Sequence, residues 1–167
     1  MKLSIRILVG IVGLTLLAGC AEKVDGAIEL KVLGSRVDQF VEFVKAGDVD
    51  GIMGQYESDP APVGYFPYGE LDNADAIRKA WEEFFATSQV IDMEVTDIRY
   101  KLDRHLAVTY GVWKMTFKRG DQEQTMHGRF TDVTAKREGV WRTMHKHVSI
   151  PLPKMPVPEN VSSGGEA

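Results

Sequence analysis

The sequence predicts an α+β domain in which helices pack on one face of an antiparallel sheet. In the first half of the chain, apolar residues recur at helical spacing; from Val90 onward they alternate with a period of two. Short polar turns separate four β-rich runs in the second half, so consecutive runs should pair as hairpins. Helices followed by a meander of strands are typical of the α+β class.

The first twenty residues predict export. Lys2 and Arg6 precede an apolar stretch over 7–18 that is too short to span a membrane. Leu17-Ala18-Gly19-Cys20 then resembles the lipobox of bacterial lipoproteins. That resemblance implies cleavage before Cys20, acylation of its thiol and amine, and a membrane anchor made of lipid. The alternative is an ordinary signal peptide followed by a chance cysteine.

Charge and cysteine content restrict what the mature protein does. Removing residues 1–19 takes away Lys2 and Arg6 and changes the formal charge from −4 to −6. An acidic domain is a poor candidate for binding nucleic acid, which requires a clustered basic face. Cys20 is the only cysteine, so its acylation leaves no thiol for a disulfide or for catalysis. Ala21 follows the cysteine where the inner-membrane lipoproteins of Gram-negative bacteria carry an aspartate. The resemblance to Gram-negative lipoproteins therefore implies the outer membrane, facing the periplasm.

Three helices are expected before the strands. Ser35 is a plausible N-cap for a helix that ends near Gly47, and a second helix begins near Asp48. Asp72 or Asn73 can cap the third. Its apolar stripe consists of Ile77, Ala80, Trp81, Phe84 and Phe85.

The strands and segment boundaries follow from the same patterns. Residues 63–68 suggest a short edge strand or an ordered loop because Pro67 interrupts them. The long β-rich runs cover 90–101, 106–118, 122–136 and 140–150. The predicted segments are a leader over 1–19, a lipidated cysteine and tether over 20–34, one domain over 35–152, and a disordered Pro/Ser/Gly tail over 153–167.

Three segments near the C-terminus resemble a known family. They are Gly128-Arg129-Phe130-Thr131-Asp132-Val133, then Gly139-Val140-Trp141-Arg142, then His145-Lys146-His147-Val148-Ser149. With the order of elements, they resemble the SnoaL-like, DUF4440-related branch of the NTF2-like superfamily. The resemblance implies a cone with a pocket between a curved sheet and the helices, and homodimers through the outer sheet face. This superfold hosts isomerases, dehydratases, cyclases and many non-catalytic domains.

Candidate ligand-binding residues come from strand alternation. Period two places Trp141, His145 and His147 on one face of the last strand, and a large aromatic residue argues that this face looks inward. Arg129 would join them if its own face is also inward, and would hold an anionic or carbonyl group. His145 and His147 would exchange protons. The expected apolar walls are Tyr56, Tyr65, Trp81 and Trp113. The alternative is that Arg129 and the histidines pair with each other and with the backbone to stabilise the sheet.

The sequence does not establish an enzyme. His145, His147 and Asp59 are candidate catalytic groups, but Asp59 precedes Pro60 and fits a turn equally well. The pair His145-x-His147 would need a third metal ligand, so no metal or other cofactor is predicted. Three hypotheses remain: a small-molecule binding protein, an isomerase-, dehydratase- or cyclase-type enzyme with a histidine base, and a scaffold that acts through dimerisation.

Overall fold

The computed structural model describes residues 26–58, 63–67 and 69–151. The predicted leader, Cys20, Asp59 and the tail over 153–167 lie outside these residues. The helices are α1 (Gly26–Ala46), α2 (Val49–Met53) and α3 (Ala74–Thr87). The strands are β1 (Val63–Phe66), β2 (Gly69–Leu71), β3 (Gln89–Asp103), β4 (Leu106–Arg119), β5 (Gln122–Arg137) and β6 (Val140–Ser149).

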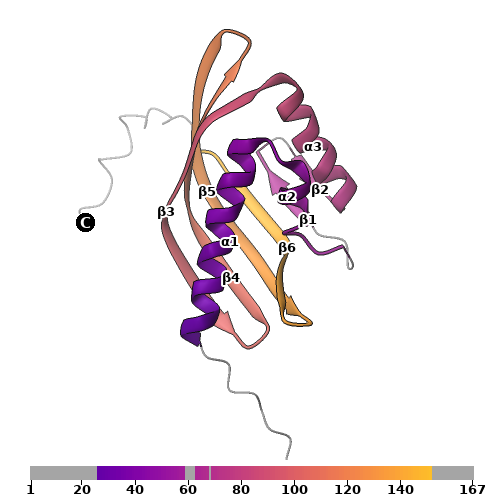
Figure 1. Ribbon diagram of the computed structural model, residues 1–167, viewed down its shortest axis with the longest axis vertical. Helices are drawn as coiled ribbons and strands as arrows, with labels where there is room; N and C mark the ends of the chain where they lie inside the picture. The colour runs from indigo at the N-terminus through magenta and orange to yellow at the C-terminus, as the bar shows by residue number, and fades with distance from the viewer. Residues whose placement is uncertain (1–25, 59–62, 68, 152–167) are drawn as a thin grey trace, which may run out of the picture.

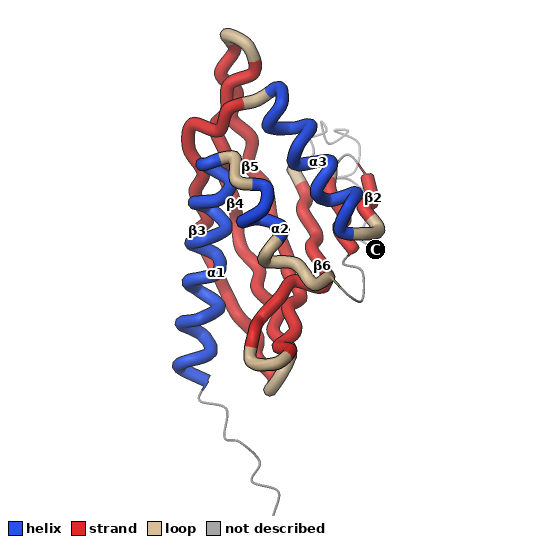
Figure 2. The backbone as a smooth tube through the Cα atoms, turned by 45° about the vertical axis from the view of Figure 1, so that its right-hand side comes forward, coloured by secondary structure: helices blue, strands red, loops and turns tan. Residues whose placement is uncertain are grey.

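The strands form one open, curved sheet in the order β2-β1-β6-β5-β4-β3. Every neighbouring pair is antiparallel except β1 and β6, which run parallel. All three helices lie on one face of this sheet (Figures 1 and 2). The predicted α+β class and the helices packed on a curved, mostly antiparallel sheet are confirmed. β1 is not an edge strand, because β2 pairs along its other side.

The predicted start of α2 near Asp48 and the capping of α3, expected at Asp72 or Asn73, are confirmed. The side chains of Asp48 and Asn73 accept hydrogen bonds from the backbone N–H groups of Gly51 and Ala76. Gly47, which ends α1, has a φ of +67°, where a side chain would be strained.

The predicted start of α1 at Ser35 was wrong, because the helix begins at Gly26. Two buried side chains hold its first turns against the sheet. Leu33 packs with Ala107 and Trp141, and the Glu29 carboxylate accepts hydrogen bonds from Lys136 Nζ and Trp141 Nε1. These contacts are made across the fold, so local capping signals do not reveal them.

Cross-strand register decides which residues face the helices. Trp113 pairs with Gly128 and Met115 with Met126, whereas Arg129 pairs with Val112 on the opposite face. Partners in a sheet share a face, so β5 presents Met126, Phe130 and Asp132 inward. Strand β4 presents Thr109, Trp113 and Phe117 inward, so Trp113 faces the helices as expected from the sequence.

A β-bulge at Met144 reverses the faces of β6. Thr143 pairs with Thr134 and His145 with Val133, so two steps along β6 match one step along β5. Trp141 and Thr143 therefore face inward before the bulge. After it, Lys146 and Val148 take the inward face.

Candidate ligand pocket

A pocket of about 500 Å³ lies between the concave face of the sheet and the helices. This volume falls within the range of small-molecule sites, roughly 300–1,000 Å³. Strands β3 to β6 form one wall, and α1 and α3 form the other. Because one chain supplies both walls, the pocket exists without a partner chain.

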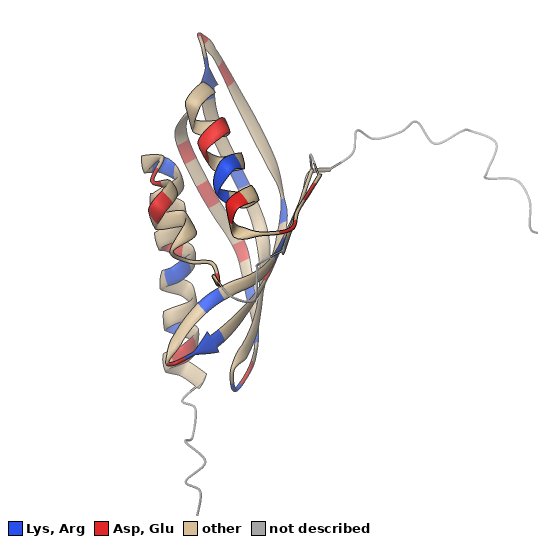
Figure 3. Cartoon of the chain, turned by 90° about the vertical axis from the view of Figure 1, so that its right-hand side faces the viewer, with Lys and Arg blue, Asp and Glu red and all other residues tan. Residues whose placement is uncertain are grey.

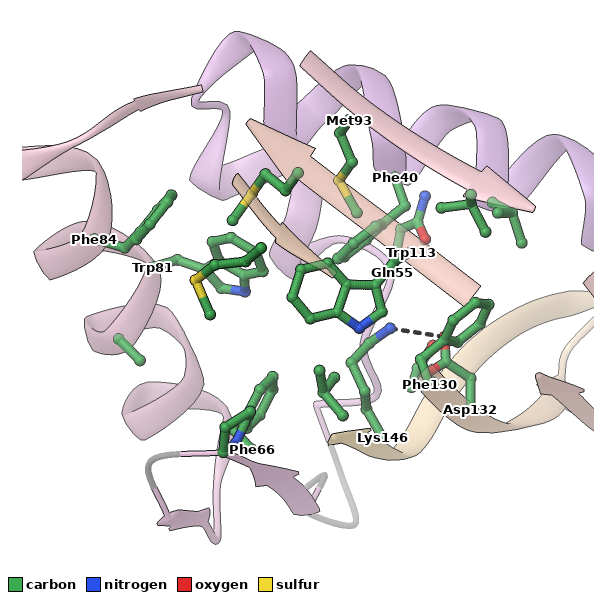
Figure 4. Close-up of a pocket in the computed structure, with 18 of the residues that line it drawn as sticks. Phe40, Gln55, Phe66, Trp81, Phe84, Met93, Trp113, Phe130, Asp132 and Lys146 are labelled. Carbon is green, nitrogen blue, oxygen red and sulfur yellow. Dashed lines mark hydrogen bonds and ion pairs between the residues drawn. The ribbon is translucent and has the colours of Figure 1, made fainter. Parts of the chain in front are cut away.

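Aromatic and sulfur-containing side chains line the body of the pocket (Figure 4). Trp81 of α3 stacks on Phe85 with ring centroids 5.5 Å apart and meets the edge of Phe40 at 6.0 Å. Phe84 packs edge-on against Phe117 at 5.4 Å. Met93, Met115 and Met126 complete this part of the lining. Methionine side chains adapt to differently shaped ligands, so these walls suit an apolar molecule.

One ion pair is buried among these apolar side chains. Lys146 Nζ donates to Asp132 Oδ2 at 2.8 Å, and the two side chains are 8% and 16% exposed. The ammonium also lies 4.5 Å from the ring centroid of Phe40 and 5.5 Å from that of Phe130. Carboxylate and rings together compensate the lost hydration of the cation.

Two polar atoms of this lining are buried without a hydrogen-bond partner among the described residues. One is a donor, Trp113 Nε1, and the other is an acceptor, Asp132 Oδ1. In the view of Figure 4, the Lys146 ammonium points in between the Trp113 indole and the Asp132 carboxylate. An unpaired buried polar group costs roughly 1–3 kcal/mol, and both atoms are covered by neighbouring side chains, so a ligand reaches them only when those side chains shift.

Arg36 closes the inner end of the pocket. Its Nη1 donates to Trp141 O at 2.6 Å, and its Nη2 donates to Gln55 O at 3.0 Å. Gln55 Nε2 returns a bond to Arg36 O at 3.0 Å. Burial lowers the pKa of the Arg36 guanidinium. With two carbonyls bound, the guanidinium links α1 to β6.

The pocket opens at the opposite end. The exposed lining residues there are Glu83 and Thr87 of α3 and Arg119 and Gln124 of the β4–β5 hairpin; one further exposed lining residue, Pro67, follows β1. Leu33, Gln55, Thr134 and Thr143 are buried at the inner end. The polarity therefore changes from a charged rim, through an apolar body, to a polar inner end.

The structure brings together only part of the predicted site. Tyr56, Trp81 and Trp113 line the pocket as expected. The inward placement of Arg129, His145 and His147 was wrong. Arg129 pairs with Val112, so its side chain lies on the outer face of the sheet. The bulge at Met144 places both histidines on that outer face as well. Tyr65 also lies outside the pocket, exposed, with its ring 5.5 Å from that of His145.

Sequence reasoning missed the residues that replace them: Lys146, Asp132, Arg36 and Gln55. For Asp132 the sequence did hold an indication. It lies an even number of residues from Met126 and Phe130, so strand alternation places it on the same face as these two apolar residues. Lys146 carried no such signal, because its face depends on the bulge. Arg36 and Gln55 bind carbonyls brought close by the tertiary fold.

No three His, Cys, Asp or Glu side chains come together as potential metal ligands within the described residues. His145 and His147 lie on the outer face of β6, and the pocket lining contains no histidine. The charged groups lining the inner pocket are thus Arg36, Asp132 and Lys146.

Comparison with known families matches residues 34–153 to the SnoaL-like domain. The chain belongs to the SnoaL-like family. The match covers nearly all of the sheet and the helices that enclose the pocket, and it begins within α1. No curated protein sequence matches the chain.

Solved structures of other proteins share this fold. A Mycobacterium tuberculosis protein of unknown function has a TM-score of 0.69 at 16% identity, over 82% of this chain and 86% of that one. An NTF2-like superfamily protein from Salmonella enterica has a TM-score of 0.66 at 19% identity, over 83% and 99%. A ketosteroid isomerase-like protein from Erwinia carotovora atroseptica has a TM-score of 0.64 at 17% identity, over 75% and 98%. At these identities the likeness concerns the fold alone.

Proposed function

We propose that this SnoaL-like domain binds a small, mainly apolar molecule that carries an uncharged polar group, without transforming it. The observation behind this proposal is the pair of unpaired polar atoms, Trp113 Nε1 and Asp132 Oδ1, in an otherwise apolar pocket. A hydroxyl or amide group both donates and accepts, so a ligand of this class can satisfy either atom once the neighbouring side chains shift to expose it.

The charges of the pocket favour a neutral ligand. Lys146 and Asp132 neutralise each other, and the Arg36 guanidinium is occupied by backbone carbonyls. An added carboxylate or ammonium would lose its hydration without gaining a free counter-ion. The sequence predicted that Arg129 would hold an anionic or carbonyl group of the ligand. We propose an uncharged ligand in its place, bound without Arg129.

The two other hypotheses receive less support. A histidine general base would have to reach a bound substrate, and His145 and His147 lie on the other side of the sheet. A scaffold would need no cavity, and about 500 Å³ is open here. The homodimer expected through the outer sheet face and the kinship with the DUF4440-related branch stay predictions.

We also propose that the protein is an exported lipoprotein, anchored through acylated Cys20 on the periplasmic side of the outer membrane. The supporting observation is the Leu17-Ala18-Gly19-Cys20 sequence after a short apolar stretch. None of the described helices is long and apolar enough to cross a membrane. Lipid would then supply the attachment, with the pocket in water.

Ligand binding is tested with three probes that share a ten-carbon body: 1-decanol, decanoate and decylammonium. Titration calorimetry below their aggregation limits should give the tightest binding for the alcohol. Trp113→Phe keeps a ring but removes the donor, so it should weaken binding about three- to tenfold. Arg129→Ala, on the outer face, is the matched control and should leave affinity unchanged.

Native mass spectrometry of the protein purified from its own host examines the same proposal without a chosen probe. A bound uncharged organic molecule, reduced in Trp113→Phe and retained in Arg129→Ala, is the expected result. A bare protein mass together with no binding of any probe would contradict the proposal and favour the scaffold.

A further inference from the structure

We propose that the end of the molecule formed by the start of α1, the β3–β4 turn and the β5–β6 turn docks against the surface of a lipid bilayer. This inference rests on the lipid anchor proposed for Cys20. It adds a second membrane contact, made by the folded domain. In the following paragraphs this surface is called the tether end and comprises Ile28, Leu30, Val32, Leu106 and Val140.

The tether end exposes large apolar side chains from three elements. Ile28 is 59% exposed, Leu106 50% and Val140 47%; Leu30 and Val32 are exposed beside them on α1. Among the described residues, only three other large hydrophobic side chains are exposed: Tyr65, Ile91 and Ile150. A shallow hollow lined by Val32, Gly139 and Val140 joins α1 to the β5–β6 turn. The exposed apolar surface is thus concentrated at this end.

The proposed anchor must lie near the same end. Cys20 stands six residues before Gly26, the first residue of α1, and six residues span at most roughly 20 Å. In Figure 1, the start of α1 and both turns lie at one end of the molecule. An acylated Cys20 therefore keeps the tether end close to the bilayer. This short connection is the reason for choosing a membrane over another partner.

Buried contacts hold the exposed side chains in place. Glu29 accepts hydrogen bonds from Lys136 and Trp141, and Leu33 packs on Ala107 and Trp141. In the sequence of α1, Glu29 stands between Ile28 and Leu30, and Leu33 directly follows Val32. The apolar side chains are thus ordered before membrane contact, and docking requires little further loss of conformational freedom.

Charge is not what selects the membrane. Both signs are present at the tether end: Lys31 near the start of α1, Asp103 and Arg104 at the β3–β4 turn, and Arg137 and Glu138 at the β5–β6 turn. Figure 3 shows basic and acidic segments together at this end. Docking should therefore depend on apolar contact with the bilayer interface and should occur on zwitterionic lipid. Salt should have little effect on it.

Docking in this orientation would direct the pocket away from the membrane. The rim residues Glu83 and Gln124 lie near the far end of α3 and of the β4–β5 hairpin. The 21-residue α1 is roughly 30 Å long, which sets the scale of the separation. The ligand would then enter from the aqueous side and not directly from the bilayer beneath.

Site-specific fluorescence quenching tests the docking. The full-length lipidated protein is placed in phosphatidylcholine vesicles that contain nitroxide-labelled lipid. Because acylation blocks Cys20, Val140→Cys provides a single thiol for a fluorophore at the tether end, and Glu123→Cys provides a matched thiol beside the β4–β5 turn. We expect loss of fluorescence at position 140 and retention at position 123. Equal fluorescence at both positions would overturn the docking.

Two controls separate the possible failures. The intact mass reports acylation: absence of acyl chains contradicts the proposed anchor, whereas acylation without quenching contradicts only the docking. In Val140→Cys protein, Ile28→Ser with Val32→Ser should restore the fluorescence while circular dichroism stays unchanged. Energy transfer between labelled copies, without quenching by lipid, would assign the tether end to a second copy and overturn the proposal.

Discussion

At the residue scale, Glu29 shows how a single carboxylate extends a helix. It lies in the first turn of α1, outside the matched family range, and is buried against the sheet. The hydrogen bond from Lys136 lowers the pKa of the Glu29 carboxyl, and that from Trp141 lowers it further. A lowered pKa in the folded state means that the ionised carboxylate stabilises the fold.

Replacing Glu29 should therefore cost stability in a pH-dependent way. Glu29→Gln is expected to lower the free energy of unfolding by about 1.5–3 kcal/mol at pH 7, as for hydrogen bonds to charged groups. The contribution is fully present above the unfolded-state pKa of about 4.3 and is lost as pH falls through the lower folded-state value. The melting temperatures of the wild type and of Glu29→Gln should consequently converge in acid.

Glu42→Gln is the matched control for this prediction. Glu42 belongs to the same helix, but its side chain is exposed and it faces Lys45 at 3.7 Å. Exposed ion pairs contribute roughly 0–1 kcal/mol. An equal loss in the two variants, or a loss in Glu29→Gln that persists in acid, would show that the buried carboxylate is not the cause.

At the element scale, the sequence was sufficient wherever local patterns decide the structure. The alternation from Val90 onward and the polar turns predicted β3 to β6 within a few residues, and Asn73 marked the start of α3. The candidate site depended on which face each strand presents. One bulge at Met144 exchanges Lys146 for His145, and no residue type in β6 announces it. The sequence therefore could not show which side chains of β6 face the pocket, and it left the register of Arg129 on β5 open.

Two glycines should respond in opposite ways to substitution by alanine. A Cβ at Gly128 would meet the backbone carbonyl of Ser149 and lie 2.9 Å from Trp113 Nε1. Gly128→Ala should therefore destabilise the sheet by about 1–3 kcal/mol. At Gly34, inside α1, the only close atom is Tyr100 Oη at 3.6 Å. Gly34→Ala should raise stability by roughly 0.5–1 kcal/mol.

Chemical denaturation measures both effects in one series. The expected pattern is a lower transition midpoint for Gly128→Ala and a higher one for Gly34→Ala, with unchanged slopes. Unchanged stability in Gly128→Ala would contradict the close packing of Trp113 on β5. That packing fixes the indole whose N–H is proposed to contact the ligand.

At the scale of the whole molecule, the open core needs an explanation. Close packing is the rule in protein interiors, and an unfilled cavity costs stability in proportion to its volume. Leu33, Ala107 and Trp141 form a small core at the tether end. The larger core includes Trp113 and Phe117, which also line the pocket, together with Val44, Ile52 and Ile77, which do not. The pocket walls are thus held by packing on the side that faces away from the open space.

Filling that space should abolish ligand binding without harming the fold. Ala80 lines the pocket from α3, and Ala80→Phe projects a ring into it. At a 1-decanol concentration of 100 times Kd, the wild type should gain about 2.7 kcal/mol of stability, seen as a higher Tm. Ala80→Phe should lose this gain, while its ligand-free stability should fall by no more than roughly 0.5 kcal/mol from helix propensity. Ala86→Phe, exposed on the same helix, should keep the ligand-induced rise. A rise retained in Ala80→Phe would place decanol outside the pocket, and the cavity would then be a packing feature without a ligand.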